Sequence, residues 1–363
     1  MGGGLVIKNY PHPGPPPEGE GSSGRRGRTM ENHEGVTAIL SNPLYITAKQ
    51  CSELLNADDV LAEIERVVAW DAAGRVRWPS PPNMNMRDRF ENHYHLKACI
   101  LDELSVAGFR LVSHNATDET SQDATRFVVL VDVESSRPLA FVDETWTYAQ
   151  RTVASIVMAA RRLAREDAGT LALVGAGRLA TTALEYYTRL FKLREVRIAS
   201  RRPETRGALA DRARARYGLR ASAAASAEAA VRGADLILTA TNSARAVLDE
   251  SWVSPGAVVG TLDSAEPGRA LVEKADLFVV DSREQLRKEL TELFGPEAPG
   301  WIDATVAEVV GGKHPGRTSG DQRVLIVTQG MASQDIALAH LAYRRAVDKQ
   351  LGQRMNAALP ETP

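Results

Sequence analysis

Two glycines separated by one residue follow a short apolar run and precede a helical pattern in residues 171–180. Gly175 allows a tight turn, and Gly177 allows the backbone to come close to a bound group, because neither carries a side chain. Ala180 supplies the small residue needed where the next helix packs on the strand. This feature limits the possible folds most, because it is typical of the first strand–turn–helix unit of an α/β domain.

Further apolar runs alternate with amphipathic helical patterns downstream of this turn. The predicted strands cover residues 171–174, 196–199, 236–239, 257–260 and 277–280. Strands that alternate with helices form a parallel sheet. We therefore predict the α/β fold class, with a Rossmann-type dinucleotide-binding domain over residues 149–317.

The helix after the glycine turn begins near Leu179, so its free backbone N–H groups face the turn. These groups carry a partial positive charge and bind phosphate oxygens. We therefore predict that Gly175, Gly177, Arg178 and Leu179 hold the diphosphate of a nicotinamide dinucleotide. A lone pattern of this kind can also be an ordinary glycine turn, and the surrounding strand–helix–strand unit favours the cofactor.

The end of the second predicted strand bears on which form of this cofactor is bound. An NAD-preferring site usually has an acidic residue there, which binds the ribose hydroxyl groups. This chain instead has Ser200, Arg201 and Arg202. Arginine binds phosphate oxygens through charge-assisted hydrogen bonds, so the sequence favours NADP(H) over NAD(H). The alternative is that both arginines are solvated surface residues.

A polar loop follows the strand over residues 236–239, at the edge where open α/β sheets bind ligands. Thr239 and Thr241 lie in this loop, and each carries a hydroxyl group that can donate or accept a hydrogen bond. We predict that they line the cofactor pocket, with an ordinary polar turn as the alternative.

The chain before this domain has a different pattern. The sequence predicts two short helices over residues 44–68, broken near Asn56, and an irregular loop over residues 77–88. Three strands follow, over residues 109–113, 127–133 and 139–142, and the last two form a hairpin. A long helix is predicted over residues 145–165. We expect a smaller α+β domain over residues 35–148. Residues 1–34 lack apolar periodicity, so we predict a disordered tail there.

Composition argues against several classes of function. The chain has 44 basic and 46 acidic residues and a net charge of -2, which gives no field that favours a nucleic acid. No apolar run approaches the roughly 20 residues that cross a bilayer. Cys51 and Cys99 are too few for a disulfide framework or a cysteine metal site. With no secretory signal pattern, these features predict a cytoplasmic protein without a membrane span or a metal.

Several motifs occur in the order in which they occur in a known family. They are residues 106–113, 138–140, 151–155, the glycine turn, 239–241, 280–285 and 329–335. Between about Leu44 and Leu351 the chain resembles the ornithine cyclodeaminase and mu-crystallin family. The resemblance implies that residues 318–358 return to the first domain, and that this domain binds the substrate and forms a homodimer.

The resemblance also implies roles for basic residues. Arg151 matches the arginine that grips the substrate carboxylate, a role that suits its planar fork of donors. The family usually has a lysine where this chain has Arg110, and arginine cannot serve as an acid or base because it stays protonated. Lys97 lies nearby in the sequence and could supply an amine, with a solvated lysine as the alternative reading.

The acidic position of the family is altered as well. Ala265 stands where the family generally has a catalytic aspartate, two residues before Pro-Gly, and Asp263 and Glu266 flank it. We take Asp263 as the candidate. By the same resemblance Met331 forms a wall beside the nicotinamide. Asp335 is expected to cap the last helix and to have no chemical role.

These features favour an NAD(P)H-dependent oxidoreductase that acts on C–N bonds of small amino or imino acids, such as an imine reductase or an amino-acid dehydrogenase. In this hypothesis Arg151 and Arg110 orient the substrate, and Lys97, Asp263 or water supplies a proton. One alternative is an ornithine cyclodeaminase with bound NAD. The other is a non-catalytic NADPH-dependent binder of small molecules, like mu-crystallin.

Overall fold

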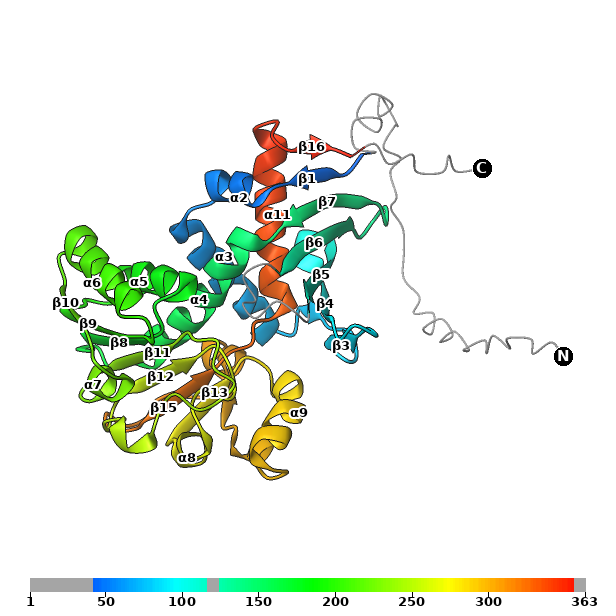
Figure 1. Ribbon diagram of the computed structural model, residues 1–363. Helices are drawn as coiled ribbons and strands as arrows, with labels where there is room; N and C mark the ends of the chain where they lie inside the picture. The colour runs from blue at the N-terminus through cyan, green and yellow to red at the C-terminus, as the bar shows by residue number, and fades with distance from the viewer. Residues whose placement is uncertain (1–41, 116–123, 356–363) are drawn as a thin grey trace, which may run out of the picture. The chain divides into compact units, whose positions relative to one another are not determined.

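The computed structural model describes residues 42–115 and 124–355 (Figure 1). The predicted tail over residues 1–34 lies outside this part of the chain. Within it, no helix is both long and apolar enough to cross a membrane.

The first sheet is mostly antiparallel and has the strand order β16-β1-β7-β6-β5-β4-β2, with β3 paired to β4. Its strands are β1 (Leu44–Ile46), β2 (Val76–Arg77), β3 (Asn83–Arg87), β4 (His93–Leu101), β5 (Val106–His114), β6 (Thr125–Asp132), β7 (Pro138–Asp143) and β16 (Gln353–Arg354). The three predicted strands are confirmed as β5, β6 and β7. The predicted hairpin turn is confirmed too, with Ser136 at a φ of 56°.

The irregular loop predicted over residues 77–88 is wrong in part. β3 lies inside it and pairs residue by residue with β4, from Asn83 opposite Lys97 to Arg87 opposite His93. The sequence of β3 alternates asparagine and methionine, and asparagine disfavours strands when judged alone. Cross-strand hydrogen bonds with β4 override this local preference, so the strand was not predictable from composition.

Helices α2 (Ala48–Leu54) and α3 (Ala57–Ala72) confirm the two helices predicted in this region. They separate at Asn56, whose Oδ1 accepts hydrogen bonds from the backbone N–H groups of Asp58 at 2.9 Å and Asp59 at 3.0 Å. This cap satisfies backbone donors at the start of α3. The predicted long helix is also confirmed, as α4 (Thr145–Leu163).

The second sheet is parallel throughout and has the order β10-β9-β8-β11-β12-β15-β13-β14. Its strands are β8 (Thr170–Val174), β9 (Glu195–Ala199), β10 (Arg220–Ala223), β11 (Leu236–Thr239), β12 (Val258–Thr261), β13 (Leu277–Val280), β14 (Ala304–Thr305) and β15 (Val324–Val327). The five strands predicted from apolar runs are all present. The α/β fold class is therefore confirmed.

Helices cover both faces of this parallel sheet (Figure 1). α4, α5 (Arg178–Leu190) and α6 (Pro203–Tyr217) pack on one face, and α7 (Ala227–Val231), α8 (Arg269–Lys274) and α9 (Arg283–Phe294) pack on the other; α10 (Val306–Val310) follows β14. Strands buried on both faces need apolar residues at every position, which explains why these runs were readable in the sequence.

The C-terminal segment is divided between the two sheets, which corrects the return predicted for residues 318–358. β15 lies in the parallel sheet between β12 and β13. Its four residues are branched and apolar and are all buried, as a central parallel strand requires. Helix α11 (Ala332–Asp348) packs on β4, β5 and β6 of the first sheet. The chain therefore crosses between the sheets at residues 328–331.

Candidate active site

The glycine turn connects β8 to α5, as the sequence predicts. Gly175 has a φ of +117°, and a Cβ atom there would lie 2.2 Å from the carbonyl oxygen of Ala240. Any side chain would therefore strain the backbone and collide with the neighbouring loop. Ala180 is fully buried where α5 packs on the sheet. Both residues are thus required by local packing.

The start of α5 offers an open cradle for an anion. Gly177 is the N-cap of this helix, makes no side-chain cap, and has no atom within 4 Å of the place of a Cβ. Arg178 and Leu179 are the first two residues of the helix, and Arg178 is exposed. The first backbone N–H groups of α5 therefore remain available to phosphate oxygens, so the turn fits a dinucleotide diphosphate.

The structure places Ser200, Arg201 and Arg202 directly after β9, beside this turn. Ser200 Oγ donates to the carbonyl oxygen of Arg202 at 2.9 Å, so its hydroxyl group is used within its own loop. Arg201 and Arg202 are exposed, and in the described part of the chain neither forms an ion pair. The two guanidinium groups can therefore reach a ligand.

Thr239 and Thr241 bind a carboxylate of the protein. Thr239 Oγ1 donates to Glu266 at 2.6 Å, and Thr241 donates to it from Oγ1 at 2.5 Å and from its backbone N–H at 2.9 Å. Glu266 is fully buried, and burial raises the pKa of its carboxyl group. The sequence did not indicate this contact, because residues 239 and 266 are far apart along the chain.

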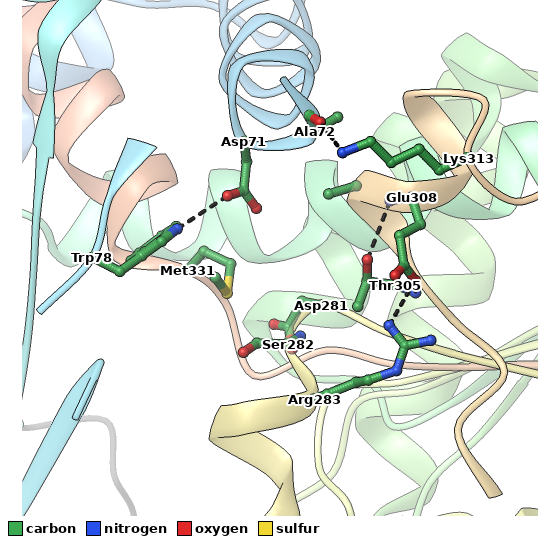
Figure 2. A pocket seen from close by; sticks show the side chains of 11 residues that line it. Asp71, Ala72, Trp78, Asp281, Ser282, Arg283, Thr305, Glu308, Lys313 and Met331 are labelled. Carbon is green, nitrogen blue, oxygen red and sulfur yellow. Dashed lines mark hydrogen bonds and ion pairs between the residues drawn. The ribbon is translucent and has the colours of Figure 1, made fainter. Parts of the chain in front are cut away.

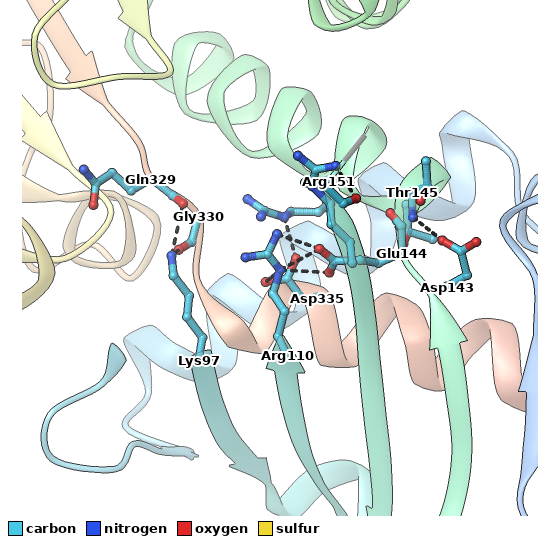
Figure 3. A network of polar contacts seen from close by, with 12 residues as sticks. Lys97, Arg110, Asp143, Glu144, Thr145, Arg151, Gln329, Gly330 and Asp335 are labelled. Atoms are coloured by element: carbon cyan, nitrogen blue, oxygen red, sulfur yellow. Dashed lines mark hydrogen bonds and ion pairs between the residues drawn. The ribbon is translucent and has the colours of Figure 1, made fainter. Parts of the chain in front are cut away.

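A buried cluster of charges lies between the first sheet, α4 and α11 (Figure 3). Arg110 on β5 makes two hydrogen bonds of 2.8 Å to Glu144 and lies 3.4 Å from the carboxylate of Asp335. Arg151 on α4 donates from Nε to Asp335 at 2.6 Å. The structure brings together Arg110 and Arg151, the two arginines for which the sequence predicted a role at the substrate. The sequence did not indicate Glu144, and Asp335 binds two arginines instead of capping its helix.

Lys97 extends from β4 toward the crossing between the sheets (Figure 3). Its side chain is buried, and Nζ donates to the carbonyl oxygens of Gln329 at 3.2 Å and Gly330 at 2.6 Å. Burial, together with the charges of Arg110 and Arg151, lowers the pKa of Lys97 to about 8. The solvated lysine considered as an alternative is therefore wrong.

Gly330 lies against both this lysine and Arg151. It has a φ of +78°, and a Cβ atom there would lie 1.7 Å from Nη1 of Arg151. Its backbone N–H donates to the buried carboxylate of Asp281 at 2.6 Å. Met331 follows, buried, with its sulfur accepting from Gln285 Nε2 at 3.1 Å. Only glycine fits at this turn.

Four guanidinium groups surround the ring of Tyr148 on α4. Their carbon atoms lie 5.7 Å (Arg110), 4.7 Å (Arg126), 5.1 Å (Arg151) and 5.9 Å (Arg178) from the ring centre. Arg178 belongs to the start of α5, whereas the other three belong to the buried part of the site. Tyr148 therefore links the glycine turn to the charge cluster.

The acidic residues near the altered family position are arranged differently from the prediction. Asp263 is exposed and accepts a hydrogen bond of 2.8 Å from the backbone N–H of Ala265, so it closes a local turn. A second carboxyl group, Glu289 on α9, contacts Ser264 and Gln329. Burial and the charge of Asp263 raise the pKa of Glu289 to about 7. Nothing in the sequence distinguished Glu289 from other acids of α9.

A cavity of about 240 Å³ is lined in part by Asp281 and Met331 (Figure 2). Asp71 on α3 lines it and accepts a hydrogen bond of 3.1 Å from the indole N–H of Trp78. Burial raises the pKa of Asp71. The lining comes from α3 and Trp78 and from the segments around the start of α9 and around α10.

Comparisons with known proteins identify the family of this chain. A sequence profile of the ornithine cyclodeaminase/mu-crystallin family matches residues 42–350. The chain belongs to this family. The alanine dehydrogenase of Archaeoglobus fulgidus is 28% identical over 323 residues, which cover 86% of this chain and 98% of the relative. A Delta(1)-pyrroline-2-carboxylate reductase of Bacillus cereus is 25% identical over 324 residues, which cover 86% of this chain and 99% of the relative.

Solved structures of family members share the fold. The Thermococcus litoralis Delta(1)-pyrroline-2-carboxylate reductase, in complex with NADH and L-proline, has a TM-score of 0.78 at 22% identity, with 86% of this chain and 100% of that chain covered. An archaeal alanine dehydrogenase dimer with bound NAD has a TM-score of 0.78 at 25% identity, with 87% of this chain and 99% of that chain covered. The Rossmann-type domain is therefore confirmed.

The buried ion pair of Arg110 and Glu144 yields a test of the cluster. Removing Glu144 leaves the buried guanidinium of Arg110 with Asp335 as its remaining carboxylate partner. Glu144→Ala should therefore lower the free energy of unfolding by about 3–5 kcal/mol. The exposed pair of Arg162 and Glu65 has the same 2.6 Å contact, so Glu65→Ala is a matched control with an expected loss of about 0–1 kcal/mol. Urea denaturation measures both, and equal losses would contradict the account of the cluster.

Proposed function

We propose that the protein is an NAD(P)H-dependent oxidoreductase that acts on C–N bonds of small amino or imino acids. The observation that supports this most is that the ring of Tyr148 contacts both Arg178, beside the glycine turn, and Arg151, in the buried cluster. A nucleotide on the turn and a carboxylate on the cluster would therefore lie next to each other. The named relatives agree, since they are dehydrogenases or reductases of amino or imino acids.

The basic residues of the site divide into two roles in this proposal. Arg110 is occupied by Glu144 and Asp335, so it positions these carboxylates and does not bind substrate. Arg151 uses Nε for Asp335 and keeps its other donors for a substrate carboxylate, which Lys97 also attracts. The bound nicotinamide supplies or accepts the hydride, and the protein holds the substrate in place and keeps water out.

The role of Lys97 leads to a pH-dependent test. An ammonium group attracts a carboxylate, and the pKa of Lys97 is about 8, so affinity for an amino acid should fall as the pH rises above 8. Lys97→Met should weaken binding of L-proline at least about tenfold and abolish this pH dependence, because Arg151 stays charged. Calorimetric titration with NADP+ present measures the affinity.

The same variant tests the reaction. Lys97→Met should oxidise NADPH with cyclic and acyclic imino acids at least about a hundredfold more slowly than the wild type, because its carboxylate clamp is incomplete. Lys49→Met, which changes an exposed lysine, should behave like the wild type. A wild-type protein that binds NADPH but turns over none of these substrates would contradict the proposed function and favour a non-catalytic binder.

We further propose that NADP(H) is preferred over NAD(H). The support is the exposed pair Arg201 and Arg202 at the end of β9, where NAD-preferring sites have an acid. The related structures named above contain NADH or NAD, so this preference would be a property of this chain. The double variant Arg201→Ala with Arg202→Ala should lose at least about tenfold in affinity for NADPH and little for NADH. Tighter binding of NADH by the wild type would contradict the proposal.

The outer face of the first sheet supports the proposed homodimer. Cross-strand register places Tyr45, Phe141, Val129, Phe109 and Ala98 in one row across five strands. The residues next to them in sequence point to the opposite face and pack against α11 and α2. Phe109 is 53% exposed and Tyr45 is 38% exposed, so the row faces solvent in one copy. An exposed apolar row of this kind is typical of an interface.

A second copy of this chain is the partner that fits this face best. A two-fold axis would bring the same apolar row from each subunit together, which is the usual geometry of homodimers. The related alanine dehydrogenase is described as a dimer.

Phe109→Asp should convert the protein to a monomer, because it would bury a charge in the apolar interface. Light scattering after size-exclusion chromatography gives the mass. Leu293→Asp, on α9 and also exposed, is the control and should leave the mass unchanged. A Phe109→Asp protein with the mass of the wild type would show that this row is not the interface.

A further inference from the structure

The proposed reaction needs a group that supplies a proton to the substrate nitrogen. Position 265 carries no acid, and the carboxylates on either side of it, Asp263 and Glu266, already accept hydrogen bonds from the protein. Glu266 is buried and accepts hydrogen bonds from Thr239 and Thr241. Asp263 is exposed and accepts from the backbone of its own loop. Neither can hold and release a proton at the crossing between the sheets without breaking these bonds.

Glu289 is connected to the buried cluster of charges through Gln329. Its carboxyl group contacts the side-chain amide of Gln329, and that amide also donates to Ser264 Oγ at 3.2 Å. The backbone carbonyl oxygen of the same Gln329 accepts from Lys97 Nζ at 3.2 Å. One residue therefore contacts Glu289 with its side chain and Lys97 with its main chain.

The surroundings of Glu289 keep a proton on it near neutral pH. Burial is the main cause of its raised pKa, and the negative charges of Asp263 and Asp281 add to it, whereas Ser264 and Lys97 act in the opposite direction. Within the described ranges, Glu289 forms no ion pair. By contrast Glu292, one turn later on α9, is exposed and lies 3.7 Å from Lys288. Glu289 is thus a half-buried acid that contacts Ser264 and Gln329 and has no counter-ion in the described part of the chain.

We propose that Glu289 is the acid that protonates the substrate nitrogen, in place of the missing acid at position 265. This inference rests on the proposed function. The O–H bond of Glu289 breaks, and the π electron pair of the C=N bond forms the new N–H bond, while the carbon takes its hydride from the reduced nicotinamide. Water returns a proton to the carboxylate. Gln329 holds the carboxyl group beside the carboxylate clamp of Lys97 and Arg151.

Glu289→Gln tests this assignment, because it keeps the shape of the side chain and removes the proton. Its rate of imino-acid reduction at saturating NADPH should fall by about 10²–10⁴-fold. The wild-type rate should decline as the pH rises through about 7, since only the protonated acid donates, and the variant should lack this step. Glu289→Asp should recover part of the activity, and Glu292→Gln should match the wild type.

A measurement without cofactor separates a chemical role from a structural one. Carboxyl carbon resonances of protein labelled with ¹³C-glutamate, compared with those of Glu289→Gln, identify the signal of Glu289. It should titrate near pH 7. Titration at the ordinary value near 4.3 would overturn the assignment. So would an active wild type matched by Glu289→Gln in rate and pH profile, whereas a wild type that reduces no imino acid would contradict the proposed function itself.

Discussion

The turn at Gly330 is the constraint on which the rest of the site depends. The chain leaves the parallel sheet at the end of β15 and enters α11 against the other sheet within four residues. At this crossing the backbone of Gly330 binds Asp281 and Lys97, and its missing side chain makes room for Arg151. The position of Lys97 relative to the parallel sheet is therefore set by main-chain carbonyl oxygens, whereas Arg151 is held by the carboxylate of Asp335.

This crossing also explains why so much charge can be buried in one place. Arg110 and Arg151 share Asp335, and Arg110 also has Glu144, so these charges are compensated in pairs. Lys97 is held instead by two carbonyl oxygens, which carry only partial charge. Burial and the charges of Arg110 and Arg151 lower its pKa, and in the proposed function a substrate carboxylate would supply a compensating charge.

The parallel sheet and the glycine turn could be predicted from sequence, because central parallel strands are apolar on both faces and a tight turn needs glycine. β4 could not be predicted, since its polar residues face the site and its strand form depends on pairing with β3 and β5. The cluster was only partly predictable: Arg110, Arg151 and Lys97 were identified, but not Glu144 or the ion pairs of Asp335. Glu266 and Glu289 were missed as partners, because their contacts join segments more than twenty residues apart.

A crystal structure of the protein with NADPH and L-proline tests the central claim most directly, namely that the glycine turn and the buried cluster form one site. We predict density for the diphosphate at the backbone N–H groups that follow Gly177, and for the amino-acid carboxylate at Arg151 and Lys97. A nucleotide bound away from the start of α5, or an amino acid bound away from Arg151, would contradict the account.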